Sequence, residues 1–204
     1  NDGGAEGVLL RLVAATNQSQ FSHSVISLSE FSAGKSGNVV GQLLHLGIPV
    51  ISLGITNKYL DVTTAVSTLY RCLRSLRPDV VQTWMYHANL IGGLVTKFTS
   101  RAPIVWNIRH SGLIRGVDSS TTIAISETCA HLSNFVPCKI ICNSNSSMEH
   151  HIRSGYCVSK MTMIPNGFDT DALKPDACAA DLLKQQLDIP QHSRLIGLVA
   201  NFRP

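Results

Sequence analysis

Three side chains able to take part in ligand chemistry lie a few residues after a short apolar run, residues 103–106. That run is rich in β-branched and aromatic residues, which favour a buried strand. Arg109, His110 and Ser111 come next, and Gly112 ends the strand. Ligands bind outside the carboxyl ends of the strands in an open α/β sheet, so a cation, an imidazole and a hydroxyl there indicate a ligand site. The alternative is a polar loop that only caps the strand.

Two further groups of polar or aromatic residues end neighbouring strands. Trp84, Tyr86 and His87 form a cluster whose aromatic faces and polar tips suit a sugar ring. Core packing is the alternative interpretation for Trp84, and it stays open here. Asn143 and Ser144 end another strand at the same edge, and we expect Ser144 to cap the next helix rather than to contact a ligand.

Strands and helices must alternate to bring these residues to one edge of a sheet, and the sequence predicts that alternation. Strands are predicted at residues 24–28, 49–53, 79–84, 103–106, 139–142 and 160–164. Helices are predicted at 5–13, 38–46, 59–76, 88–99, 119–135 and from 146, where residues 146–149 have the form of a capping box. The alternation predicts the α/β class: a Rossmann-like parallel sheet with helices on both faces. Gly92 and Gly93 allow the helix 88–99 to pack closely on that sheet.

Both ends of the sequence lead us to expect further structural elements outside these 204 residues. Gly3 and Gly4 form a turn before the first helix; such a turn normally follows a strand and lets backbone N–H groups face a phosphate or a sugar. A Gly-Gly turn alone is more often a plain helix entry. We expect a first strand before Asn1. Because the apolar strand predicted at 195–200 has no partner, we also expect a second α/β domain after it.

Composition excludes several other classes of protein. With 44% hydrophobic and 15% charged residues, the chain is not of the disordered type. No apolar run approaches the roughly 18 residues of a membrane span. The net charge of +4 is scattered, which argues against a nucleic-acid partner. Arg71, Arg74 and Arg77 share one helix face, which is either solvated or in contact with an anionic membrane surface.

Cysteine and histidine usage bears on metal binding and on the cellular compartment. The six cysteines and eight histidines fit no metal-ligand spacing, so no metal site is expected. His150 and His151 are adjacent on a predicted helix, so their rings should point to different faces. Scattered cysteines in a chain of this length suit a reducing compartment, and we expect the protein in the cytoplasm.

Taken together, the motifs resemble family 4 of the retaining glycosyltransferases with the GT-B fold, also called glycosyl transferases group 1. The resemblance covers nearly the whole chain, and the order and spacing of the motifs carry it. The matching segments are Gly3-Gly4-Ala5-Glu6 at the first helix and residues 76–81, 106–111, 141–144, 164–169 and 196–200.

The resemblance implies two facing Rossmann-like domains, of which this chain is the N-terminal half, truncated at both ends. Residues 1–172 would be the acceptor-binding domain without its first strand, 173–194 a linker and helix, and 195–204 the first strand of the donor-binding domain. The implied activity is transfer of a sugar, with retention, from a nucleoside-diphosphate sugar to a polysaccharide or lipid-linked acceptor. The implied context is bacterial cell-surface polysaccharide biosynthesis. No metal or other cofactor is expected.

The resemblance also implies roles for the residues after the strand 103–106. His110 matches the cleft histidine of the family, and we expect it to hydrogen-bond the donor sugar or the transition state as the catalytic residue. An imidazole can donate a hydrogen bond from one ring nitrogen and accept one at the other, which suits this role. Ser111 is expected to orient His110. Arg109 is expected to contact a phosphate or, equally, to pair with a carboxylate.

Other residues are expected to contact substrate more peripherally. The candidates are Gly3, Gly4, Trp84, Tyr86, His87 and Asn143. Arg203 is a weak candidate for the donor phosphate, because the family often has arginine directly after the strand, where this chain has Asn201. The family's pair of glutamates lies outside this chain, so these 204 residues alone are expected to be inactive.

Alternatives of other classes stay open. A dinucleotide-binding Rossmann protein would need Gly-x-Gly-x-x-Gly after a strand and an acidic ribose partner, which this sequence lacks. A sugar-nucleotide epimerase shares the two-domain fold but not these motifs. A non-catalytic orphan domain that binds a sugar acceptor or a protein partner would fit if the 204 residues were the whole natural product. Peripheral contact with the inner face of the plasma membrane is also left open.

Overall fold

The computed structural model describes residues 4–29, 39–55, 59–171 and 173–198. Contacts divide the chain into two compact units, Asn1–Gly167 and Phe168–Pro204. The domain organisation expected from the sequence, with its first boundary after residue 172, stays a prediction.

The first unit begins with a small parallel sheet and two helices. Its elements in chain order are α1 (Gly4–Ala15), β1 (Val25–Ser27), α2 (Val39–His45) and β2 (Val50–Ser52). β1 and β2 pair in parallel, with Val25 opposite Val50. Their core consists of four buried aliphatic side chains, Val13, Val39, Leu43 and Ile48.

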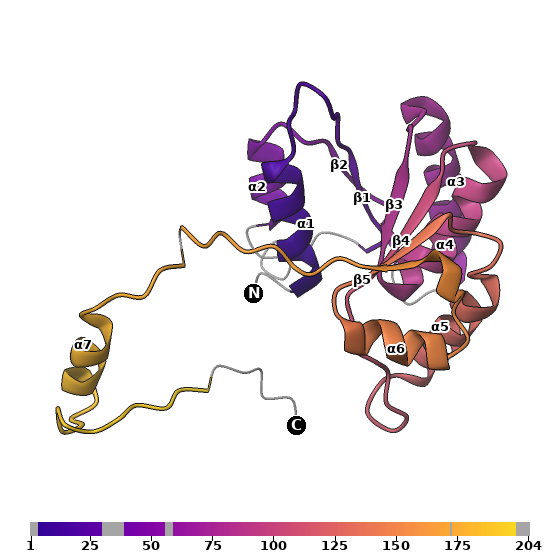
Figure 1. Ribbon diagram of the computed structural model, residues 1–204. Coiled ribbons are helices and arrows are strands. Elements are labelled where there is room, and N and C mark those ends of the chain that lie inside the picture. Colours follow the sequence, from indigo (N-terminus) through magenta and orange to yellow (C-terminus); the bar gives the residue numbers. More distant parts are fainter. Residues whose placement is uncertain (1–3, 30–38, 56–58, 172, 199–204) are drawn as a thin grey trace. The chain divides into compact units, whose positions relative to one another are not determined.

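A second parallel sheet, with strand order β3-β4-β5-β6, forms the larger part of the unit. Its elements are α3 (Tyr59–Leu76), β3 (Val81–Trp84), α4 (Met85–Thr99), β4 (Ile104–Ile108), α5 (Ser120–Leu132), β5 (Lys139–Cys142), α6 (Asn145–Arg153), the short 3₁₀ helix η1 (Val158–Lys160) and β6 (Met161–Met163). α4 packs on β3 and β4, and α6 packs on β5 and β6, as can be followed in Figure 1. The predicted α/β class with parallel strands and flanking helices is confirmed.

The strands form two parallel sheets where the sequence predicted one. Among the residues that the structure describes, β1 pairs only with β2 and β3 only with β4, so no strand ladder joins the two sheets there. A shared core joins them instead. Ile26 of β1 and Val81 of β3 both pack against the buried face of α3, which includes Leu69 and Leu73. Apolar packing is non-directional, so it holds the sheets together without backbone pairing.

The close approach of α4 to the sheet depends on its two glycines, as the sequence predicted. A Cβ on Gly93 would lie 2.9 Å from Trp106 Nε1, and one on Gly92 would lie 3.0 Å from Thr83 Cγ2. Trp106 of β4 is fully buried at the centre of the largest core cluster. Small residues at these positions therefore let the helix backbone lie directly on β3 and β4.

The starts of two helices, α4 and α6, change the position expected for candidate site residues or caps. α4 begins at Met85 rather than at residue 88, so Tyr86 and His87 lie in its first turn and not in a loop after β3. α6 begins at Asn145 and is capped by Ser144, whose hydroxyl accepts a hydrogen bond from the Ser147 N–H. The predicted capping box at 146–149 therefore lies inside the helix. The expectation that Ser144 caps the helix is confirmed.

The second unit contains α7 (Ala179–Gln186), which lies within residues 173–194, where the sequence predicted a linker and a helix. Residues 195–198 form no strand, while residues 199 and 200 of that predicted strand lie outside the described residues. The apolar side chains of Ile196 and Leu198 are exposed. An isolated strand has no neighbour to complete its backbone hydrogen bonds, which explains why the pattern alone does not produce one. No helix within the described ranges is long and apolar enough to cross a membrane.

Candidate functional site

The carboxyl ends of β3 to β6 lie along one edge of the larger sheet because the strands are parallel. Trp84 ends β3, Arg109 follows β4, Asn143 follows β5, and Asn166 lies in the segment after β6. Arg109 connects three of these ends. Its guanidinium lies 5.1 Å from the centre of the Trp84 ring, and its Nη1 donates to Asn166 Oδ1 at 2.8 Å.

Arg109 is further fixed by its own strand. Its Nη2 donates to Asn107 Oδ1 at 3.0 Å, and Asn107 is fully buried. Partial burial lowers the pKa of Arg109, because desolvation penalises the charged form. The side chain is therefore held in one place, at the cost of removing part of its charge from water.

The His110 ring is half-buried and fixed at one nitrogen. The backbone N–H of Gly112 donates to His110 Nδ1 at 3.2 Å. In the neutral ring one nitrogen accepts and the other carries the proton, so this bond leaves the N–H on Nε2. His110 is thus a hydrogen-bond donor through Nε2 when it is neutral.

Gly112 is required for this arrangement because the His150 ring packs directly against it. A Cβ at Gly112 would lie 2.6 Å from His150 Nδ1, so any other residue would displace the ring or the loop. The loop after β4 is also tied to α6, since the Ser147 hydroxyl donates to the His110 carbonyl at 2.7 Å. The backbone on both sides of the His110 ring is therefore held by α6.

A series of buried hydrogen bonds connects α4 and α6 to this loop. His151 Nδ1 is 2.7 Å from the Ser147 carbonyl oxygen, which can only accept, so Nδ1 carries the proton. His151 Nε2 then accepts from the Tyr86 hydroxyl at 2.8 Å. Burial lowers the pKa of His151 and raises the pKa of Tyr86, so both stay neutral at physiological pH. These hydrogen bonds run from Tyr86 on α4 through His151 and Ser147 on α6 to the backbone carbonyl of His110.

The expected site residues take different places in this structure. Trp84, Arg109, His110 and Asn143 are half-buried at the carboxyl edge, whereas His87 and Ser111 are exposed. Tyr86 is only 2% exposed and its hydroxyl is bonded to His151, so its ring is packed inside the domain rather than presented to a sugar. The orienting role expected of Ser111 stays a prediction, and the bonds that fix His110 come from Gly112 and Ser147.

The glycine turn and the last arginine are less informative. Gly4 is the first residue of α1, and a Cβ there would meet no atom within 4 Å. Gly3 and Arg203 lie outside the described residues. Within the part of the chain that the structure describes, no group of three or more histidines, cysteines or acidic residues is placed to hold a metal ion.

Sequence reasoning missed the contributions of Asn107, Ser147 and His151. Asn107 lies within an apolar strand, where period and composition indicate only burial. Ser147 and His151 are four residues apart on α6, so they share one helix face, and that spacing was the available signal. The prediction that the rings of His150 and His151 point to different faces is wrong. The two rings meet edge to face with their centroids 5.4 Å apart, while His150 also covers Gly112 and His151 is buried against Tyr86.

Taken together, the edge presents the Nε2–H donor of His110, a fixed guanidinium from Arg109 and the amide of Asn143. Hydrogen-bond donors and a cation that are already positioned suit the oxygen atoms of a sugar or a phosphate. Donors held in this way stabilise growing negative charge without reorganising at the moment of reaction.

A sequence profile described as Glycosyltransferase Family 4 matches residues 2–172 of the chain. Comparison with curated protein sequences finds no significant match. Among solved structures, HepE from Anabaena in complex with UDP matches with a TM-score of 0.67 and 20% identity, over 92% of this chain and 47% of HepE. A glycosyltransferase from Rickettsia africae matches with a TM-score of 0.64 and 15% identity, over 93% of this chain and 47% of that protein.

The fold by itself does not select the reaction. A UDP-N-acetylglucosamine 2-epimerase from Rickettsia bellii also matches, with a TM-score of 0.50 and 12% identity, over 82% of this chain and 44% of the epimerase. The chain thus spans about half the length of the solved structures it matches. At these identities the structural matches show a shared fold, and the family match rests on the sequence profile.

Proposed function

Because the chain belongs to Glycosyltransferase Family 4, we propose that it is the acceptor-side domain of a glycosyltransferase. The complete enzyme transfers a sugar from a nucleoside-diphosphate sugar to a glycan or lipid-linked acceptor, with retention at the anomeric carbon. The observation that carries the proposal is the family match together with His110, which stands at the end of a central strand as a fixed Nε2–H donor. No metal or other cofactor is included in the proposal.

The donor of this proposal is a UDP-sugar. HepE, which shares the fold, was solved with UDP and with UDP-glucose. Cleavage of such a donor leaves a nucleoside diphosphate, so negative charge grows on a phosphate oxygen in the transition state. In the proposal His110 donates from Nε2 to the donor sugar or to the transition state, and the glycines of the first turn leave room for the phosphate or the sugar.

The acceptor contacts the edge formed by the other strand ends. Trp84, with the Arg109 guanidinium against its ring, offers an aromatic surface for a sugar, and His87, Ser111 and Asn143 offer polar contacts around it. Arg203 remains a weak candidate for the donor phosphate.

The cellular context is also part of the proposal. We assign the enzyme to bacterial cell-surface polysaccharide biosynthesis in the cytoplasm, with peripheral contact at the inner face of the plasma membrane and no nucleic-acid partner. The membrane contact is supported by the cations at the far end of the domain, where Arg74, Arg77 and Arg101 line one hollow and Phe98 nearby is 84% exposed.

The test is turnover by the complete protein that contains this chain. His110→Ala should lower kcat about 100-fold or more, because it removes a donor that acts in the transition state. The melting temperature should change little, since His110 is only half-buried. His131→Ala, at an exposed position on α5, is the matched control and should keep wild-type turnover.

Two results would count against this proposal. Wild-type turnover by His110→Ala would remove the catalytic role of that residue. Failure of the complete protein to turn over any nucleotide sugar would favour the second candidate, a non-catalytic domain that binds a sugar acceptor or a protein partner.

A further inference from the structure

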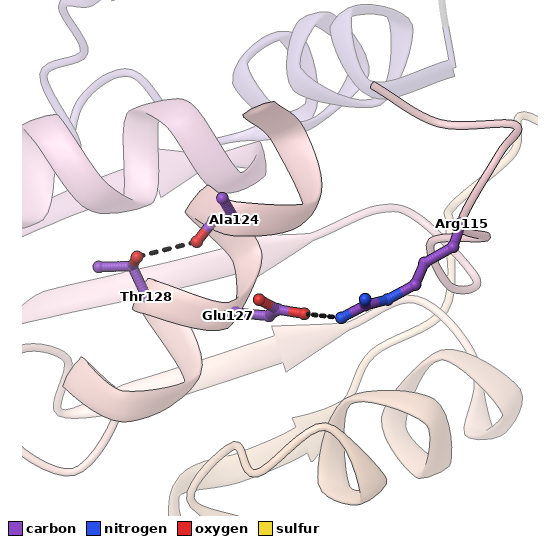
Figure 2. Close-up of polar contacts among 4 residues, drawn as sticks. All are labelled: Arg115, Ala124, Glu127 and Thr128. Carbon is purple, nitrogen blue, oxygen red and sulfur yellow. Dashed lines mark hydrogen bonds and ion pairs between the residues drawn. The ribbon is translucent and has the colours of Figure 1, made fainter. Parts of the chain in front are cut away.

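Arg109 is a cation without an anionic partner in the described structure. No carboxylate within the described ranges lies within 4 Å of its guanidinium. Arg115, six residues later, shows the usual arrangement: its Nη2 lies 2.9 Å from Glu127 Oε1 at the surface (Figure 2). The two arginines of the same loop region therefore differ in how their charge is balanced.

Every hydrogen-bond partner of Arg109 among the described residues is neutral. The acceptors are Asn166 Oδ1, Asn107 Oδ1 and, at 3.5 Å, the Ile164 carbonyl oxygen. The remaining contact is with the face of the Trp84 ring, which attracts a cation but carries no net charge. These groups orient the guanidinium firmly and leave its positive charge uncompensated.

Arg109 and its hydrogen-bond partner Asn107 also carry donors that have no acceptor. Its Nε–H and the Nδ2 of Asn107 are buried without a partner among the described residues. Nη2 carries a second N–H beyond the one given to Asn107. A partly desolvated cation with unsatisfied donors is unfavourable unless an anion accepts from them.

We propose that Arg109 forms an oxyanion-binding subsite, and that the ligand reaching this edge of the sheet carries a phosphate or a carboxylate. The inference rests on the proposed function and narrows its substrates. The anion is either the diphosphate of the donor or an acidic group on the acceptor, such as a sugar phosphate or a uronate. Asn107, Asn166 and Trp84 hold the guanidinium ready, so little rotamer freedom is lost when the anion binds.

The test titrates the whole chain with four probes and follows binding by calorimetry. Pyrophosphate represents the donor diphosphate, glucose 1-phosphate and glucuronate represent acidic acceptors, and glucose is the neutral probe. Arg109→Gln keeps a side-chain donor but removes the charge, and should weaken binding of the anions at least tenfold. Arg115→Gln is the matched control and should bind them like the wild type, since Glu127 already balances that charge.

A second measurement needs no variant, in case Arg109→Gln does not fold. In the wild-type chain, the ¹⁵N-resolved Nε–H signal of Arg109 should shift on titration with an anion, and the signal of Arg115 should not. Binding of pyrophosphate alone assigns the subsite to the donor. Binding of glucose 1-phosphate or glucuronate assigns it to the acceptor, and either result supports the proposal.

The inference is overturned if no anion shifts the Arg109 signal, or if Arg109→Gln binds all four probes like the wild type. Its failure is separable from failure of the proposed function. Turnover that depends on His110 but not on Arg109 would remove the subsite alone. An intact anion subsite in a complete protein that turns over no nucleotide sugar would remove the transferase and leave the subsite.

Discussion

The imidazole of His151 is 1% exposed and hydrogen-bonded at both ring nitrogens. Tyr86, Tyr156, His110 and His150 surround it, and none of these supplies a negative charge near it at neutral pH. Protonating His151 would break its acceptance of the Tyr86 hydroxyl and place a charge in a dry site. The folded chain therefore binds this proton less well than the unfolded chain does.

This difference predicts how stability depends on pH. The pKa of His151 in the folded chain lies below its value of about 6.5 in the unfolded chain. The stability that arises from this difference is therefore present above pH 6.5 and is lost as the pH falls below it. The loss amounts to about 1.4 kcal/mol per pH unit until the folded pKa is reached. Urea unfolding at pH 7.5, 6.5 and 5.5 should show a steeper loss for the wild type than for His151→Gln.

The control for this prediction is His131→Gln, whose side chain is exposed and should leave the wild-type pH dependence in place. Parallel curves for the wild type and His151→Gln would mean that His151 is not the group that titrates. In that case protonation of His151 would not be what lowers the free energy of unfolding at acidic pH.

Among the elements, α6 does most to position the loop after β4. It supplies Ser147 to the His110 carbonyl, and the His150 ring to Gly112. Its first turn is fixed by Ser144, whose hydroxyl satisfies one of the N–H groups that a helix start leaves without a partner. Any loosening of that turn should therefore reach His110.

The N-cap of α6 at Ser144 can be tested against Ser146, where the predicted capping box begins. Ser144→Ala should lower the free energy of unfolding by about 1 kcal/mol, because it removes the N-cap acceptor. Ser146→Ala is the matched control: it is exposed inside the helix, where alanine has the higher helix propensity, and should be neutral or slightly stabilising. Urea unfolding measures both changes, and equal losses would contradict the assignment of Ser144.

At the scale of the whole domain, the strands differ in how fully they are paired and covered. β4 pairs with a neighbour on each side, and four of its five residues are buried. β1 pairs only with β2 within the described part of the chain, and all of its residues are half-buried. The two sheets share apolar packing under α3, and no strand ladder joins them in the described ranges.

This contrast predicts unequal local stability within Asn1–Gly167. Amide hydrogen exchange in β4 should be at least about tenfold slower than in β1, because opening β4 disrupts two ladders and the largest core cluster. Exchange followed by mass spectrometry on peptides that cover the two strands measures this. Equal protection of β1 and β4 would show that the two sheets open together as one cooperative unit.

The sequence by itself determined the element pattern and the family. Alternating apolar runs and amphipathic helices predicted each strand before Phe168 to within two residues, because burial of apolar side chains follows local periodicity. The predicted strand end also put Arg109 and His110 at the carboxyl edge of the sheet, where the structure has them, since parallel strands bring their carboxyl ends to one edge. The motif order pointed to Glycosyltransferase Family 4, which the profile match over residues 2–172 confirms.

Only the tertiary structure decided which side chains work together at that edge. The burial of Tyr86, the link from His151 through Ser147 to His110, and the neutral partners of Arg109 all join residues far apart in the chain. Such contacts depend on how α4, α6 and the segment after β6 pack, which no local pattern encodes. The division into two sheets has the same origin, because strand pairing depends on which edges meet in space.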